Sequence, residues 1–270
     1  IVIILYAFIS SGNLGFYNPI VLGSLIISII IISIFVRRQL TISNPLLNLN
    51  VFKGRIFCFS TITSMIIMLS MVGPALLIPL YVQNALGLSA LLSGLVIMQG
   101  AIINVIMSVF SGRLYDKYGP RRLIYAGFSL LTICTLLLCF LKADTSYIYL
   151  IVIYAIRMFA VSLLMMPINT TGINALDNKD ISHGTAIMNF GRVMAGSLGT
   201  ALMVTFMSIG SKWIGPSSSA HASKELLQRQ SVAAGVDVSF ALVTGFVVVA
   251  FLFALFIKEP NRKSQNMREV

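Results

Sequence analysis

The run Gly-Arg-Leu-Tyr-Asp-Lys-Tyr-Gly-Pro-Arg-Arg, residues 112–122, decides the fold class of this chain. It places five charged residues and two glycines between two long apolar stretches. An apolar stretch of about 20 residues is long enough to cross a bilayer as a helix. The run therefore predicts a very short polar turn between two membrane-spanning helices.

The composition of the chain also indicates a membrane protein. Of its 270 residues, 57% are hydrophobic and 10% are charged, whereas soluble domains carry about 25% charged residues. The net charge is +11, but the basic residues lie in the connections between apolar spans. That placement is typical of membrane topology and not of nucleic-acid binding. We therefore expect the lipid bilayer, and no nucleic acid, as a partner.

Seven complete spans are predicted from the apolar stretches, at approximately 19–36, 57–82, 91–111, 122–141, 147–172, 184–210 and 238–257. A half-span at 1–10 is too short to cross a bilayer, and it predicts a helix that starts before Ile1. A β-barrel would require shorter, alternating segments. We expect an all-α integral membrane protein with three parts: 1–56 (the end of one helix, a second helix and a cytoplasmic linker), 57–257 (a six-helix lobe) and 258–270 (a tail).

The positions of Lys and Arg predict the orientation of the spans, because cytoplasmic loops carry an excess of these residues. If Arg37 and Arg38 are cytoplasmic, 13 basic residues lie inside and 4 lie outside, while Arg157 and Arg192 lie within spans. The tail 258–270 is then cytoplasmic in a multi-pass cell-membrane protein. The longest connection, Ser211–Asp237, is external and is expected to contain a short surface helix around Glu225 and Arg229.

The polar run resembles the cytoplasmic signature loop of the major facilitator superfamily. The resemblance rests on Gly112, Asp116, Lys117, Gly119, Arg121 and Arg122. In that family the charge cluster is thought to latch one transporter conformation, so the resemblance implies a conformational latch at these six residues. The alternative is positive-inside topology combined with a tight turn. Pro120 departs from the first copy of the loop and is similar to the second copy, in the C-terminal half.

Two further stretches resemble one branch of that family, the 14-helix drug:proton antiporters of the EmrB/QacA type, which include lincomycin-type exporters. Residues 44–52 resemble the linker before the C-terminal half, and residues 78–89 look like the outer end of the ninth helix. The spans would then be the end of helix 7 and helices 8–14. The resemblance implies proton-driven efflux of a small amphipathic substrate by alternating access, with the N-terminal lobe missing from this chain and no cofactor. The alternative is a transporter of the same fold for another small solute, such as a metabolite exporter or symporter.

Arg157, Asn189 and Arg192 are the candidates for the transport pathway. Arg157 lies about 15 Å into its span at 1.5 Å per residue, where a charge must face a cavity or a partner. No Asp or Glu is predicted in mid-span, so we expect a carboxylate partner in the missing half. The alternative is a structural arginine bonded to backbone carbonyls or Asn side chains. Arg192 could instead snorkel or support close helix packing.

Small residues and prolines indicate helix packing and hinges. Gly191, Ala195 and Gly199 recur every four residues and predict a close helix contact, and Gly196 lies on a stripe with Asn189 and Arg192. Pro74, Pro79 and Pro167 interrupt two spans, as hinges or as structural kinks. Five methionines could form an adaptable pocket or face lipid: Met65, Met68, Met71, Met165 and Met166.

An enzyme is not expected. His183 and His221 are predicted on opposite sides of the membrane, and the three cysteines lie in apolar segments without the spacing of metal ligands. A catalytic site requires a cluster of such groups. We therefore predict no catalytic residue and no metal site.

Overall fold

The computed structural model describes residues 18–42, 48–142, 144–213 and 224–255, together with Ile3 and Tyr6. In these ranges the chain is helical and contains no strand. The elements in chain order are α2 (Pro19–Thr41), the 3-10 helix η1 (Leu49–Lys53), α3 (Arg55–Asn84), α4 (Ala90–Tyr118), α5 (Pro120–Leu137), η2 (Leu138–Phe140), α6 (Tyr147–Asn174), η3 (Asn178–Asp180), α7 (Ile181–Trp213) and α8 (Lys224–Leu255). Seven helices of this described part are long and apolar enough to cross a membrane. The predicted all-α membrane fold is confirmed.

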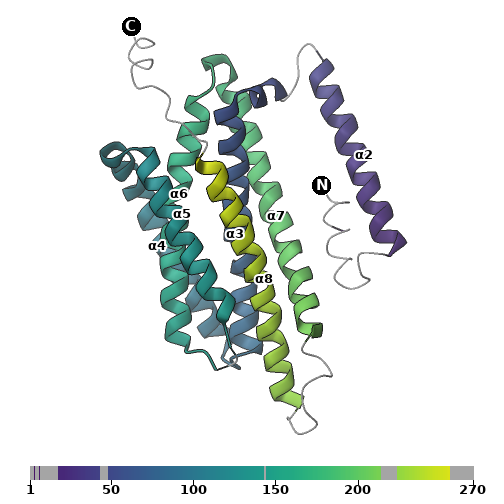
Figure 1. Cartoon of the computed structure of the whole chain (residues 1–270), viewed down its shortest axis with the longest axis vertical. Coiled ribbons are helices and arrows are strands. Elements are labelled where there is room, and N and C mark those ends of the chain that lie inside the picture. The colour runs from purple at the N-terminus through teal and green to yellow at the C-terminus, as the bar shows by residue number, and fades with distance from the viewer. Residues whose placement is uncertain are drawn as a thin grey trace.

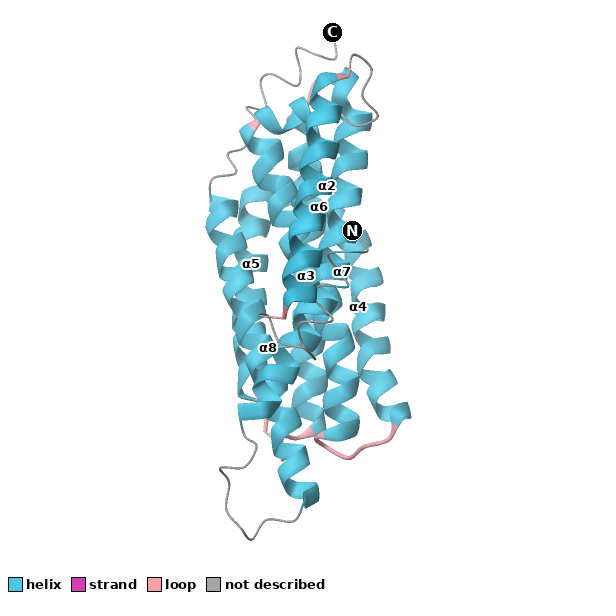
Figure 2. Cartoon of the chain, turned by 90° about the vertical axis from the view of Figure 1, so that its right-hand side faces the viewer, coloured by secondary structure: helices cyan, strands magenta, loops and turns pink. Residues whose placement is uncertain are grey.

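Helices α3 to α8 form a bundle whose members run alternately in opposite directions (Figures 1 and 2). One end of the bundle holds η1, η3 and the junction between α4 and α5, and we call it the Gly119 end. The opposite end holds the α3–α4 turn and Lys142, and we call it the Lys142 end. The distribution of basic residues predicts that the Gly119 end faces the cytoplasm.

Helix α2 lies beside the bundle and apart from it (Figure 1). Its contacts with the rest of the chain are concentrated at η1. Ile29 and Ile34 expose about 59% and 61% of their surface, and isoleucines are exposed along most of its length. A helix that is apolar on all sides is suited to lipid or to another membrane helix.

The polar run 112–122 is almost entirely helical. Helix α4 continues to Tyr118 and α5 begins at Pro120, so Gly119 alone separates them. Gly119 has a φ of 77°, a conformation that glycine adopts without the strain of a side chain. Pro120 occupies the first position of α5, where the missing N–H leaves no helical hydrogen bond unmade. The predicted turn is therefore a single residue, and the signature residues before it lie on the last two turns of α4.

The prediction for the last span was wrong at its start. Helix α8 begins at Lys224 and not near residue 238, so the short surface helix expected around Glu225 and Arg229 is continuous with the last span. A close contact with α7 explains the difference: a Cβ atom built on Gly210 would lie 2.9 Å from Cα of Gly235. Val236 is also fully buried there. Tertiary packing thus keeps this stretch helical despite its polar composition. Residues 1–10, apart from Ile3 and Tyr6, and the predicted tail 258–270 lie outside the described residues.

Candidate functional site

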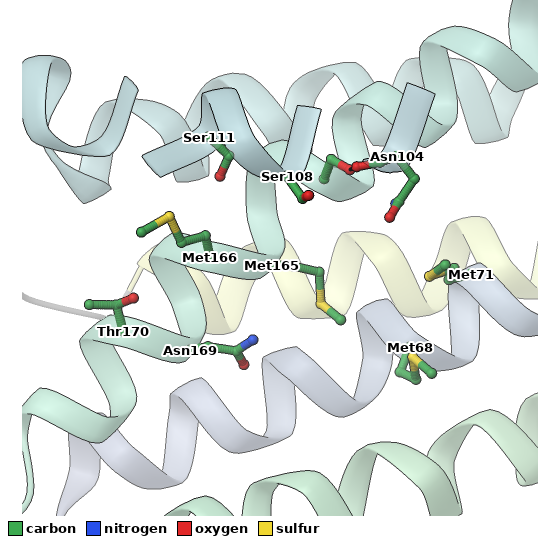
Figure 3. Close-up of a pocket in the computed structure, with 10 residues that line it drawn as sticks. Met68, Met71, Asn104, Ser108, Ser111, Met165, Met166, Asn169 and Thr170 are labelled. Carbon is green, nitrogen blue, oxygen red and sulfur yellow. Dashed lines mark hydrogen bonds between the residues drawn. The ribbon is translucent and has the colours of Figure 1, made fainter. Parts of the chain in front are cut away.

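A cavity of about 470 Å³ lies between α3, α4 and α6. Figure 3 shows side chains from all three helices pointing toward it. Its lining consists of methionines and uncharged polar residues: Met68, Met71, Asn104, Ser108, Ser111, Ser162, Met165, Met166, Asn169 and Thr170. Among these residues there is no Asp, Glu, His, Lys or Arg.

Helical spacing brings the lining residues to one side of each helix. On α4, Asn104, Ser108 and Ser111 follow at steps of four and three, which places them on one face. On α6, Ser162, Met166 and Asn169 follow the same steps. The sequence analysis did not predict these Asn and Ser residues as part of a site. Polar residues that recur at helical spacing within an apolar span were the signal that could have identified them.

The predicted adaptable pocket included five methionines, and four of them line this cavity: Met68, Met71, Met165 and Met166. Met65 lies elsewhere, because its Sδ would contact a Cβ atom built on Gly191 of α7 at 3.0 Å. A thioether side chain is flexible and polarizable, so it adapts to ligands of different shape. The methionines thus give the cavity an apolar surface that does not demand one ligand geometry.

Three hydrogen bonds hold polar groups at the cavity in place. The Ser64 hydroxyl donates to Oδ1 of Asn169 at 3.3 Å, and the Ser162 hydroxyl donates to the backbone carbonyl of Asn104 at 3.1 Å. The Ser108 hydroxyl donates to the carbonyl of Val105 at 2.7 Å. The first bond joins α3 to α6, the second joins α6 to α4, and the third lies within α4. The Asn104 side-chain amide has no partner among the described residues.

The six residues of the predicted latch lie together at the end of α4 and the start of α5. Gly112 approaches the cavity, since a Cβ atom there would lie 3.5 Å from Sδ of Met166. Asp116, Lys117, Arg121 and Arg122 are exposed. Arg121 donates through Nε to the hydroxyl of Tyr125 at 2.9 Å, and Nζ of Lys117 lies 5.3 Å from the centre of the Tyr118 ring.

Asp116 forms no hydrogen bond or ion pair with another residue of the described ranges. A carboxylate at a membrane surface keeps most of its hydration while it is exposed, so it can exchange water for a cationic partner at little desolvation cost. Its position one turn beyond the cavity places a free acceptor at the Gly119 end of α4.

Arg157 is fully buried between α6 and α3. Its Nη2 donates to the backbone carbonyl of Ser70 and, at 3.0 Å, to the Ser70 hydroxyl. Its Nε and Nη1 have no hydrogen-bond partner in the part of the chain that the structure describes. Arg157 does not line the cavity, and its lack of exposed surface leaves no atom for a second lobe to contact directly in this conformation.

Asn189 and Arg192 form a pair on α7, where Arg192 donates through Nη2 to Oδ1 of Asn189. Asn189 is exposed and Arg192 is half-buried. Neither residue lines the cavity. The structure therefore does not bring these two residues together with Arg157, which lies inside the bundle on α6.

The small residues of α7 lie against α3. A Cβ atom on Gly199 would lie 2.9 Å from the Leu69 carbonyl oxygen, and one on Gly196 would lie 3.3 Å from Val72. Ala195 is buried beside them. Pro74 and Pro79 lie inside α3, and Pro167 lies inside α6, and both helices continue through them.

Asp237 is an acidic residue that the sequence analysis predicted at the end of the external connection Ser211–Asp237. It lies inside α8 and is half-buried. Its Oδ1 accepts a hydrogen bond from the backbone N–H of Leu141 at 3.1 Å. The Tyr81 hydroxyl donates to the carbonyl of Lys142 at 2.5 Å. Helices α3 and α8 thus hold the end of the α5 segment in place at the Lys142 end, and Asp237 lies in a helix and not in a loop.

Comparison with known proteins places this architecture in a family. Residues 1–200 match the family model of the Major Facilitator Superfamily. The chain is 36% identical to the lincomycin resistance protein LmrB of Listeria innocua, over 96% of this chain and 54% of that protein. It is 26% identical to the multidrug export protein EmrB of Escherichia coli K12, over 73% of this chain and 38% of that protein. It is also 26% identical to the riboflavin transporter RibZ of Clostridioides difficile, over 76% of this chain and 44% of that protein.

The chain spans about half the length of the curated relatives that it matches, such as the lincomycin resistance protein of Listeria innocua. The family model covers most of the chain, including α2 to α6 and much of α7. The membrane-length helices, the signature residues around Gly119 and this coverage agree with one another. The chain therefore belongs to the Major Facilitator Superfamily.

Proposed function

We propose that this chain forms one lobe of a membrane exporter that moves amphipathic drugs by alternating access, driven by inward proton flow. The observation that carries the proposal is the adaptable, methionine-lined cavity next to the signature residues on α4. The similarity to a lincomycin resistance protein and to a multidrug export protein supports it. The second lobe, expected to precede this one in the complete protein, supplies the opposite wall of the substrate path.

Alternating access requires the two lobes to rock about a site near the middle of the membrane. The Gly119 end would then open and close against the other lobe, with Asp116 as the latching carboxylate. Gly112 connects this end to the cavity, because it lies against Met166, a lining residue. A movement of the end of α4 is thereby transmitted to the cavity wall.

The topology follows from the same proposal. The protein is a multi-pass cell-membrane protein whose Gly119 end and C-terminal tail face the cytoplasm, where the positive charge of 113–122 is favoured. Reaction of introduced cysteines with a membrane-impermeant maleimide tests this orientation. A cysteine at exposed Lys117 should react only after the membrane is opened, and one at Lys142 should react in intact cells.

The function is tested by measuring lincomycin accumulation in cells that carry or lack the complete gene. Cells with the gene should accumulate less lincomycin, and an uncoupler should abolish the difference. The control for lost transport is a strain that expresses the protein with Gly119→Val, where a β-branched residue cannot adopt a φ of 77° without strain. Accumulation that does not change when the gene is deleted would contradict drug export.

A second candidate is transport of a metabolite, and the similarity to a riboflavin transporter favours it. Uptake of labelled riboflavin into the same two strains distinguishes the candidates. Riboflavin uptake that depends on the gene, together with unchanged lincomycin accumulation, would replace the drug-export proposal.

A further inference from the structure

We propose that this cavity selects uncharged amphiphiles that carry hydroxyl or amide groups over lipophilic cations. The inference rests on the proposed function, since it concerns the substrate class of the same cavity. Asn104 and Asn169 are proposed as the residues that determine this specificity.

The lining offers little to hold a cation. A buried cation is stabilised by a carboxylate or by the face of an aromatic ring. The ten lining residues include neither an acidic nor an aromatic side chain. The buried Arg157 lies outside the lining and is itself positively charged. This wall therefore stabilises a neutral ligand better than a positively charged one.

The lining offers much to a neutral polar ligand. A side-chain amide has two donors and one acceptor. The Asn104 amide uses none of them on another described residue, and Asn169 uses only its Oδ1, toward Ser64. The Ser111 hydroxyl is buried without a hydrogen-bond partner in the described ranges. Hydroxyl or amide groups of a ligand would satisfy these polar groups.

The arrangement also separates polar from apolar surface. Figure 3 shows Asn104, Ser108 and Ser111 on α4, with Asn169 and Thr170 on α6 across the cavity and methionines between and below them. An amphiphile can place its polar groups against the two amides and its apolar part against the thioethers. A site built to hydrogen-bond its ligand discriminates strongly against a compound that leaves those polar groups unpaired.

The test uses the complete transporter in proteoliposomes with an imposed pH gradient. The two probes are chloramphenicol, which is neutral and carries hydroxyl and amide groups, and the lipophilic cation tetraphenylphosphonium. The unmodified protein should transport chloramphenicol in preference to the cation. Asn104→Leu and Asn169→Leu, which keep the side-chain size, should each raise the KM for chloramphenicol about tenfold, the loss of roughly one good hydrogen bond.

A charge substitution tests the same idea in the opposite direction. Asn169→Asp should gain transport of tetraphenylphosphonium and lose transport of chloramphenicol. The matched control is Asn174→Asp, the same substitution on the same helix at an exposed position outside the cavity, which should change neither. Protein abundance and melting temperature are measured for every variant, and the two leucine variants provide independent tests if one of them is unstable.

The outcomes separate this inference from the proposed function. Transport of the cation in preference to chloramphenicol by the unmodified protein would overturn the inference and leave export intact. Unchanged chloramphenicol kinetics in both leucine variants would also overturn it. Transport of neither probe by vesicles that still transport lincomycin would overturn the inference and leave export intact. Absence of lincomycin transport as well, under a gradient that the vesicles maintain, would overturn the proposed function.

Discussion

Substitution of Gly199 by alanine tests how tightly α7 is packed against α3. A Cβ atom at Gly199 would lie 2.9 Å from the carbonyl oxygen of Leu69 and 3.1 Å from its Cα, whereas ordinary contact begins at 3.4 Å. The two helices would have to separate by about 0.5 Å at this point. The atoms in the way belong to the backbone of α3, so a change of side-chain rotamer cannot relieve the contact.

The matched control is Gly245→Ala on α8, where a new Cβ atom would meet nothing within 4 Å. Both positions lie inside helices, and alanine favours a helix over glycine by about 1 kcal/mol at each. Overpacking of a well-packed contact destabilises by about 1–3 kcal/mol. The difference between the two variants therefore isolates the packing contribution, because the helix-propensity contribution cancels.

The assay is the melting temperature of the purified protein in detergent, followed by size-exclusion chromatography. In water-soluble chains of comparable size, 1 kcal/mol corresponds to about 2–4 °C. Gly199→Ala should melt below the unmodified protein or close to it, and clearly below Gly245→Ala, which should melt at the same temperature or higher. Equal melting temperatures for the two alanine variants would refute the close contact between α7 and α3.

Substitutions at three further positions test separate parts of the structure. Asp116→Asn should reduce transport several-fold while abundance stays normal, because the exposed carboxylate contributes to switching and not to folding; wild-type transport rates would refute the latch. Arg157→Ala should impair transport more than Arg157→Lys, since lysine keeps a donor for the Ser70 carbonyl, and full activity in both variants would reduce the arginine to a scaffold role. Asp237→Ala should lower the stability by about 1–3 kcal/mol because the buried N–H of Leu141 loses its acceptor. Asp237→Asn keeps an acceptor and should be milder in a thermal-melt assay; identical melts for both variants and the unmodified protein would show that this contact does not stabilise the bundle.

For the part of the chain that the structure describes, hydropathy and length alone were sufficient to predict the seven membrane-length helices, because a bilayer requires about 20 apolar residues whatever their tertiary contacts. The tight junction after α4 could also be predicted from the sequence alone. Gly119 and Pro120 favour a turn through their own backbone preferences, which are local properties of the two residues. The signature residues were recognisable for the same reason, since their spacing along the chain carries the resemblance.

The start of α8 required the tertiary structure. Residues 224–237 mix polar and apolar side chains, and their pattern predicted only a short surface helix separate from the last span. The structure joins them to the last span in one helix that packs closely on α7 at Gly210 and Gly235, residues that are distant in sequence. Asp237 was misplaced for the same reason, and its contact with Leu141, 96 residues earlier at the end of the α5 segment, cannot be inferred from either position alone.

The candidate site likewise depends on the tertiary structure. In a membrane helix that is apolar on all sides, hydrophobicity does not distinguish the face toward lipid from the face toward other helices. The sequence predicted a charged residue in the middle of a span at Arg157, but only the fold places it inside the bundle against Ser70 and away from the cavity. Asn104 and Asn169 are ordinary polar residues in two separate spans. They form one cavity wall because α4 and α6 pack side by side, and that packing depends on contacts between residues far apart in the chain.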